Sequence, residues 1–143
     1  MTFLLDVNVL IALIDPGHAS NKTALAWFSG TGSPAWATCP MTENAVVRIA
    51  GHPSYPNSPG SPAIVAKLLE QLIAMPGHEF WPDDVSILNR ETFDLSRMIT
   101  AKQVTDSYLL ALALAHGGQL ATLDGRLVPD AVKRGAQALY LIR

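Results

Sequence analysis

The chain has 143 residues, of which 49% are hydrophobic and only 15% are charged. This composition excludes a disordered chain and a coiled coil, and the length predicts a single domain over residues 1–143. Ten lysine and arginine residues face twelve aspartate and glutamate residues, so the net charge of −2 gives no bulk basic charge for a nucleic-acid partner.

Cysteine usage and hydropathy predict a cytoplasmic protein. Cys39 is the single cysteine, which excludes an internal disulfide and a cysteine-based zinc site. The N-terminus has no basic residues, and Asp6 interrupts its apolar run, so it does not read as a signal peptide. The longest apolar run, Tyr108–Ala115, is far shorter than the ~20 residues of a membrane span.

Strands and helices are predicted to alternate along the first half of the chain. Phe3–Leu5 predicts a buried parallel strand, and Val7–Ile14 continues it as a helix that ends before Pro16. The later elements of this half are a helix at Ala19–Ser29, a strand at Ala35–Cys39, a helix capped by Thr42, a loop at Gly51–Pro62 and a helix that Ser61 caps.

The second half continues the alternation. Its predicted elements are a strand at Phe80–Trp81, a helix in two pieces at Val85–Ile99, a buried helix at Gln103–His116, a strand at Leu120–Leu123, a short helix at Pro129–Arg134 and a strand at Leu139–Ile142. Strands that alternate with helices indicate an α/β domain built on a parallel sheet.

Four acids fall where ligands bind in such a sheet, beyond the carboxyl ends of its strands. Asp6 and Asp124 each follow a predicted strand, Glu43 lies in the first turn of the helix after the second strand, and Asp106 is expected in the first turn of the buried helix. Carboxylates gathered at one edge raise one another's pKa values. A divalent cation relieves that repulsion, and oxygen ligands select Mg²⁺ or Mn²⁺.

Each acid also has a simpler explanation. Asp106 could be a charge favoured by the helix dipole, Asp124 an ordinary turn residue before Gly125, and Glu43 a capping residue. Asp6 fits such an explanation least, because it interrupts a run that should be buried and a buried carboxylate needs a partner. The joint placement therefore favours a site.

The segments Leu4–Leu10, Thr42–Asn44, Val104–Ala113 and Leu120–Asp124 contain these acids in order. They resemble the acidic motifs of PIN-domain nucleases and, more narrowly, those of the VapC ribonuclease toxins of bacterial toxin–antitoxin pairs. The resemblance spans nearly the whole chain, and it implies a three-layer α/β/α PIN-domain fold with a central parallel sheet of four to five strands.

The resemblance further implies a metal-dependent endoribonuclease that leaves 5′-phosphate and 3′-hydroxyl ends. Asp6, Glu43, Asp106 and Asp124 would be the catalytic acids, and Mg²⁺, or alternatively Mn²⁺, would be held by Asp6, Asp106 and Asp124. The residues expected to orient these acids are Asn8, Thr105 and Thr122.

Implied partners are an RNA substrate, a cognate antitoxin and a second copy of the chain. Arg48, Lys102 and Arg126 lie close in sequence to the acids, so they could hold RNA phosphates or acidic groups of a partner, or could be plain surface charges. With four acids assigned to one site, eight remain against ten basic residues, and the net charge of −2 no longer excludes RNA.

Two other functions remain open. A phosphatase of the haloacid dehalogenase type would use Asp6 as its nucleophile, but that family has a second aspartate where this chain has Asn8. A non-catalytic binding module would keep only the fold. Trp36 and Trp81 could lie in the core or stack on bases, the core is favoured for Trp27, and the pair Asp83-Asp84 is interpreted as solvated or capping.

Overall fold

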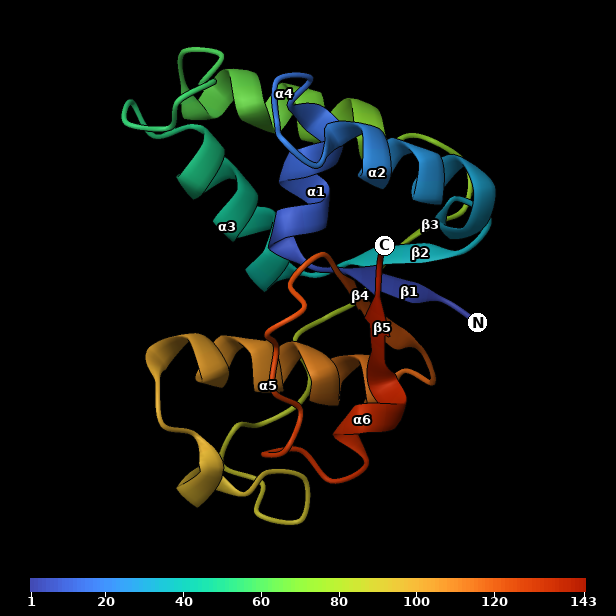
Figure 1. Cartoon of the computed structure of the whole chain (residues 1–143), viewed down its shortest axis with the longest axis vertical. Helices are drawn as coiled ribbons and strands as arrows, with labels where there is room; N and C mark the ends of the chain where they lie inside the picture. Colours follow the sequence, from blue (N-terminus) through green and yellow to red (C-terminus); the bar gives the residue numbers. More distant parts are fainter.

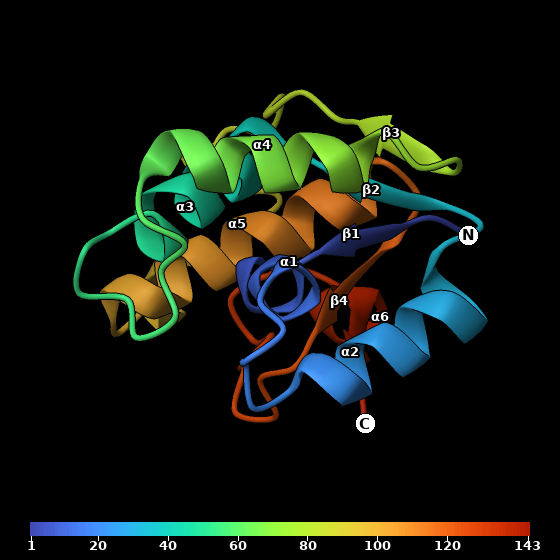
Figure 2. The same cartoon turned by 90° about the horizontal axis from the view of Figure 1, so that it is seen from above.

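The computed structural model describes residues 1–143 and contains a five-stranded, all-parallel sheet between two layers of helices (Figures 1 and 2). The strand order is β3 (His78–Phe80), β2 (Trp36–Thr38), β1 (Phe3–Leu5), β4 (Gln119–Thr122) and β5 (Leu139–Leu141). The predicted three-layer α/β fold with a parallel sheet is therefore confirmed, with five strands.

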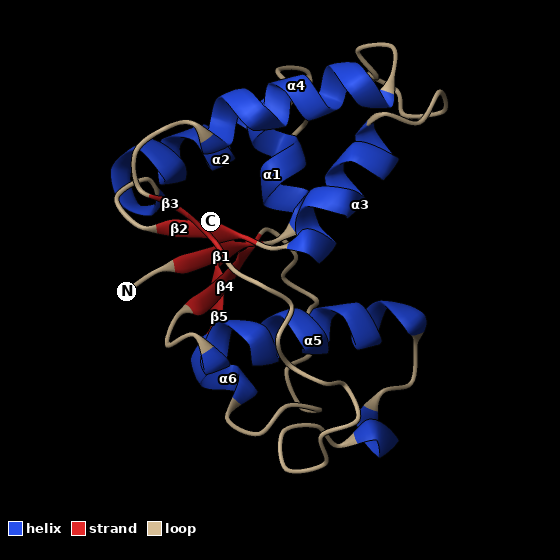
Figure 3. Cartoon of the chain, turned by 180° about the vertical axis from the view of Figure 1, so that it is seen from behind, coloured by secondary structure: helices blue, strands red, loops and turns tan.

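The two helical layers come from different parts of the chain (Figures 1 and 3). One layer contains α1 (Val7–Ile14), α2 (Asn21–Trp27) with the π-helical turn η1 (Phe28–Gly32), α3 (Pro40–Ala50) and α4 (Pro62–Ile73). The other contains α5 (Ala101–Ala115) and α6 (Gly135–Ala138). None of these helices is both long and apolar enough to cross a membrane.

Neighbouring residues of β1 pack into two separate cores, because side chains alternate between the two faces of a sheet. Phe3 and Leu5 pack with Trp36 in the core beneath α1–α4, whereas Leu4 packs with Leu120 in the core beneath α5. Strand β1 is thus apolar at every position, as expected for a central parallel strand that is covered on both faces.

The sheet reverses its order between β1 and β4, and this is where an open α/β sheet binds its ligands. From β1 the chain proceeds to β2 and β3 on one side, and then returns to β4 and β5 on the other. Asp6 follows β1 directly, and its backbone N–H donates to the carbonyl of Ala121 in β4 at 2.9 Å. Asp124 lies two residues after β4. Both acids therefore flank the switch point.

Two predicted helix starts are wrong by a few residues. Helix α3 begins at Pro40 with Cys39 as its N-cap, so Thr42 is not the cap but the third helical residue, and its hydroxyl contacts the backbone of Cys39. Helix α5 begins at Ala101 after a capping box between Thr100 and Gln103. Asp106 is consequently not in the first turn, and the helix dipole no longer explains it.

The helix predicted in two pieces at Val85–Ile99 is absent. Between Val85 and Ile99 the chain forms turns and one 3-10 turn, η2 (Leu95–Arg97). Side chains there accept from nearby backbone N–H groups, namely Ser86 from Leu88, Asn89 from Glu91 and Asp94 from Ser96. Such local bonds compete with helix formation.

The short helix expected at Pro129–Arg134 is displaced to α6. Arg134 adopts a left-handed backbone conformation with φ of 61°, which ends any helix before it. The next residue must be small, because a Cβ on Gly135 would lie 2.5 Å from the carbonyl oxygen of Pro129. The helix can therefore form only from Gly135 onward.

Candidate functional site

Asp6 is a buried carboxylate at the end of β1 and the start of α1. Its side chain accepts hydrogen bonds from the Val7 backbone N–H at 2.7 Å and from the Thr122 hydroxyl at 2.8 Å. Burial raises the pKa of Asp6, the nearby charge of Asp106 adds to the rise, and the two hydrogen bonds and the charge of Lys102 only partly offset it. The surroundings of Asp6 therefore disfavour its ionised form.

The Thr122 hydroxyl connects Asp6 with two further residues of the edge. Thr122 is fully buried, donates to Asp6, and accepts from the Asn8 side-chain amide at 3.2 Å and from the Asp124 backbone N–H at 3.1 Å. Asn8 in turn accepts from the backbone N–H of Leu123 at 3.2 Å. Asn8 thus orients Asp6 through Thr122 and does not bond it directly.

Lys102 joins the other two acids of this edge. Its ammonium lies 2.7 Å from a carboxylate oxygen of Asp106 and 2.7 Å from one of Asp124. The hydrogen bond from Lys102 and the backbone N–H of Arg126 lower the pKa of Asp124. Lys102 therefore faces into the acidic edge, where one amino group already occupies a cation position between two carboxylates.

Glu43 is held separately from the other acids. It projects from α3, and one of its carboxylate oxygens accepts from the Thr38 hydroxyl at 2.7 Å. Thr38 also lies 2.7 Å from Nε2 of His78. Neither Thr38 nor His78 was identified from the sequence as a site residue, although Thr38 ends β2 as Thr122 ends β4, which is a signal that could have found it.

The remaining expected site residues lie further out. Thr105 is exposed on α5 and makes no side-chain hydrogen bond, because the helical turn of 100° per residue points it away from the face of Asp106. The expectation that it supports an acid is wrong. Arg48 and Arg126 are exposed and form no ion pair.

The donor chemistry of the edge suits a hard divalent cation. Asp6, Asp106 and Asp124 offer only oxygen atoms, which Mg²⁺ prefers, and Lys102 already places positive charge among them. No three carboxylate, imidazole or thiolate groups converge on one point in a metal-binding arrangement. Mg²⁺ needs only one or two direct carboxylates because it keeps several of its waters. The residues therefore fit the ion, and the two buried acids, Asp6 and Asp106, are the ones that would bind it directly.

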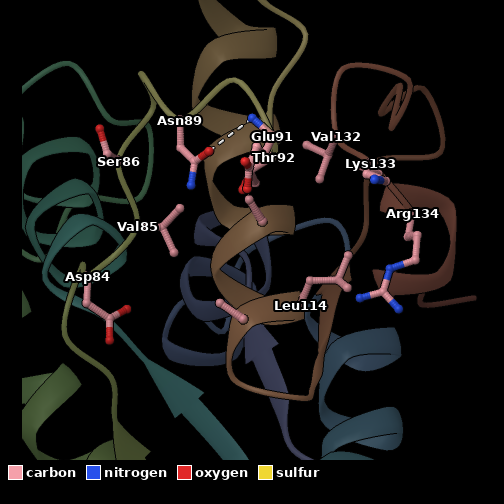
Figure 4. Close-up of a pocket in the computed structure, with 12 residues that line it drawn as sticks. Asp84, Val85, Ser86, Asn89, Glu91, Thr92, Leu114, Val132, Lys133 and Arg134 are labelled. Carbon is pink, nitrogen blue, oxygen red and sulfur yellow. Dashed lines mark hydrogen bonds between the residues drawn. The ribbon is translucent and has the colours of Figure 1, made fainter.

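One hollow elsewhere in the molecule contains none of Asp6, Asp106 and Asp124. A hollow of about 350 Å³ lies beside the C-terminal half of α5, between Asp84, Leu114 and Arg134 (Figure 4). The three tryptophans are buried in the core, so their rings are not available to stack on bases. Asp83 and Asp84 are exposed: Asp83 accepts from the Met41 backbone N–H near the start of α3, and Asp84 pairs with His116.

Comparison with known proteins identifies the family. A PIN domain profile matches residues 3–131. Ribonuclease VapC44 of Mycobacterium tuberculosis is 46% identical over 138 residues, which cover 94% of this chain and 96% of the relative. The chain belongs to the VapC family of PIN-domain ribonucleases. The resemblance seen in the acidic motifs is confirmed.

Other VapC proteins support the assignment. Ribonuclease VapC39 of the same organism is 42% identical over 131 residues, covering 92% of this chain and 94% of the relative. The crystal structure of M. tuberculosis VapC20, a sarcin–ricin loop cleaving toxin, superposes with a TM-score of 0.60 over 87% of this chain and 91% of VapC20. At 12% identity, that likeness bears on the fold alone.

Proposed function

We propose that this VapC-family chain is a Mg²⁺-dependent endoribonuclease and the toxin of a type II toxin–antitoxin pair. The observation that carries the proposal is the buried carboxylate of Asp6 at the switch point of the sheet, with Asp106 as its charged neighbour. Burial and the charge of Asp106 raise the pKa of Asp6, and a bound divalent cation would relieve that cost.

Each residue of the edge has a proposed part in the reaction. Asp6 and Asp106 would hold Mg²⁺, and Asp124 and Glu43 would orient water beside it. When bound, the ion would activate a water and neutralise charge on the phosphoryl oxygens. Thr122 keeps the Asp6 carboxylate in place through its 2.8 Å hydrogen bond. Attack of water on phosphorus and rupture of the P–O3′ bond leave a 5′-phosphate and a 3′-hydroxyl.

The test is cleavage of total cellular RNA by the purified chain with MgCl₂. New 5′-phosphate ends are expected with the wild-type chain, and their loss is expected with EDTA and with Asp6→Asn or Asp106→Asn. A matched control is Asp130→Asn, which changes an exposed aspartate outside the site. Release of phosphate from small phosphomonoesters without RNA cleavage would reject the proposal in favour of a phosphatase.

The two alternative functions find no supporting observation. A haloacid dehalogenase-type phosphatase needs an acid at position 8, but the Asn8 amide is engaged at both ends with Thr122 and Leu123. A non-catalytic module has no need to bury Asp6 and Asp106 side by side.

The proposed antitoxin finds support in a groove of about 340 Å³ between α3 and α4. It is lined by the apolar side chains of Val47, Leu69 and Ile73 and by the acids Glu43 and Glu70. An amphipathic segment with a basic residue suits such a groove and would cover Glu43. Ala66→Glu is expected to prevent neutralisation by the product of the neighbouring gene while RNA cleavage persists. If the Ala66→Glu variant were still neutralised, the groove between α3 and α4 would be rejected as the antitoxin contact.

The homodimer remains a prediction from the family. Exposed apolar side chains such as Phe80, Leu88 and Ile99 are available for a partner. Light scattering of the purified chain measures its mass directly, and a monomer at all concentrations would reject the dimer.

A further inference from the structure

Glu43 is the end of a three-residue hydrogen-bonded chain that starts at His78. The Thr38 hydroxyl oxygen lies 2.7 Å from a carboxylate oxygen of Glu43 and 2.7 Å from Nε2 of His78. Thr38 is fully buried, so water cannot replace either partner. The three residues come from the end of β2, the first turn of α3 and the start of β3.

The chemistry of the groups sets the direction of these bonds. An ionised carboxylate can only accept, so the single Thr38 proton must point to Glu43. The Thr38 oxygen must then accept from His78, which requires a hydrogen on Nε2 of the imidazole. With a hydrogen on Nε2, His78 cannot accept the Thr38 proton, so that proton is left to Glu43.

The His78 ring is itself held in position. It packs edge-on against Trp36, with ring centroids 4.7 Å apart and an angle of 61° between the planes. Trp36 is fully buried and also packs edge-on against Phe28, at a centroid distance of 5.2 Å. Trp36 and His78 are paired in the register of β2 and β3, so the backbone also fixes their separation.

We propose that His78 is a positioning residue for ribonuclease activity, acting through Thr38 to hold the Glu43 carboxylate toward the acidic edge. The inference rests on the proposed function of Glu43, and it adds a histidine that the acidic motifs do not include. His78 itself touches neither substrate nor the acids. Its removal lets the Thr38 hydroxyl rotate, so Glu43 loses its fixed orientation while the fold persists.

The test compares variants that keep or remove the hydrogen-bonding group of His78 or of Thr38. The quantity measured is the rate at which new ends form in total cellular RNA with MgCl₂. His78→Phe keeps the ring but removes the donor, and Thr38→Val keeps the shape but removes the hydroxyl. Each is expected to lower the rate roughly three- to tenfold, the effect of one hydrogen bond. His78→Gln, which restores an N–H at the ε position, and Thr38→Ser are expected to recover most of the loss.

Two further variants keep the result specific. The double variant of His78→Phe and Thr38→Val is expected to be no slower than Thr38→Val alone, because both act on one chain of bonds. His52→Phe, at an exposed histidine that is not part of the hydrogen-bonded series of His78, Thr38 and Glu43, serves as the matched control. Thermal denaturation of every variant separates slow cleavage from unfolding, and the Thr38→Ser and Thr38→Val pair remains informative where His78→Phe does not fold.

The outcomes distinguish this inference from the function on which it rests. Wild-type rates for His78→Phe and Thr38→Val, with Glu43→Gln inactive, overturn the role of His78 and leave the proposed function intact. A wild-type rate for Glu43→Gln overturns the proposed part of Glu43 itself. Nitrogen-15 NMR of the imidazole gives a readout without RNA: a hydrogen on Nε2 is expected, and a neutral ring with its hydrogen on Nδ1 overturns the inference.

Discussion

Asp6 and Asp15 stand at the two ends of helix α1, and both are buried, with 6% and 8% of their surface exposed. The helix dipole favours a carboxylate at the N-terminus, where Asp6 lies, and disfavours one at the C-terminus, where Asp15 lies. The pKa values move the opposite way: that of Asp6 is raised and that of Asp15 is lowered.

The difference arises from the donors around each carboxylate. Burial alone would raise the pKa of Asp15, but hydrogen bonds from Tyr55, Asn57 and the Gly17 backbone outweigh it. Asp15 thereby fastens the proline-rich loop after α3 to the end of α1. Asp6 has fewer donors and a second acid nearby. A buried acid whose hydrogen bonds outweigh the cost of burial is structural, whereas one whose pKa stays raised despite them marks a candidate cation site.

The largest expected effect is on cleavage, from Asp6→Asn. We expect the rate to fall by at least about a hundredfold, because a ligand of the proposed ion is lost. Removing an unfavourable buried charge should leave the free energy of unfolding unchanged or raise it. RNA cleavage and urea denaturation measure the two quantities on the same preparation. A variant that unfolds readily would make Asp6 structural, and the contrast with Asp15 would disappear.

The converse variant, Asp15→Asn, should lower stability. We expect a loss of about 1–3 kcal/mol in the free energy of unfolding, since three donors lose a charged acceptor. Tyr55→Phe removes one of these bonds and should cost less. Both variants should cleave RNA at the wild-type rate at temperatures where they are folded. Loss of cleavage in the folded Asp15→Asn variant would contradict a purely structural role.

The pH dependence of stability should separate the two acids by sign. The lowered pKa of Asp15 contributes stability above its unfolded value of about 3.9, and this is lost as the pH falls through the folded pKa. The raised pKa of Asp6 does the reverse: its favourable contribution is complete below about 3.9 and is lost as the pH rises through the folded pKa.

Urea denaturation across this range, with and without each aspartate, tests the prediction. Asp15→Asn should flatten the loss of stability in acid, and Asp6→Asn should remove the loss that accompanies rising pH. Parallel curves of unfolding free energy against pH for Asp6→Asn and the wild type would mean that the pKa of Asp6 is not raised in the folded protein.

The smallest effect is expected for Lys102→Met. The Lys102 side chain is 64% exposed, so its ion pairs with Asp106 and Asp124 should contribute less than about 1 kcal/mol to folding. Mg²⁺ affinity, measured by calorimetry, should rise because a competing cation is removed. Lys22→Met, at an exposed lysine on α2, is the matched control. Weaker Mg²⁺ binding would instead assign Lys102 to support of the site.

The periodicity and chain order of the sequence determined the architecture and the approximate place of the acids. Apolar runs that end in Asp6 or just before Asp124 predict parallel strands with acids at one edge, because strand period and strand ends are local features. Local signals failed where local bonds compete, as between Val85 and Ile99, where short side chains of serine, asparagine and aspartate take the backbone N–H groups.

Only the tertiary structure decided which side chains meet. Lys102 was expected to face RNA or a partner, yet it lies between Asp106 and Asp124, which are 4 and 22 residues away. Thr38 donates to Glu43 and lies within hydrogen-bond distance of His78, forty residues away, and Tyr55 reaches Asp15 across the same separation. The physical reason is that a hydrogen bond depends on distances set by sheet register and helix packing. Residue type and spacing along the chain do not contain those distances.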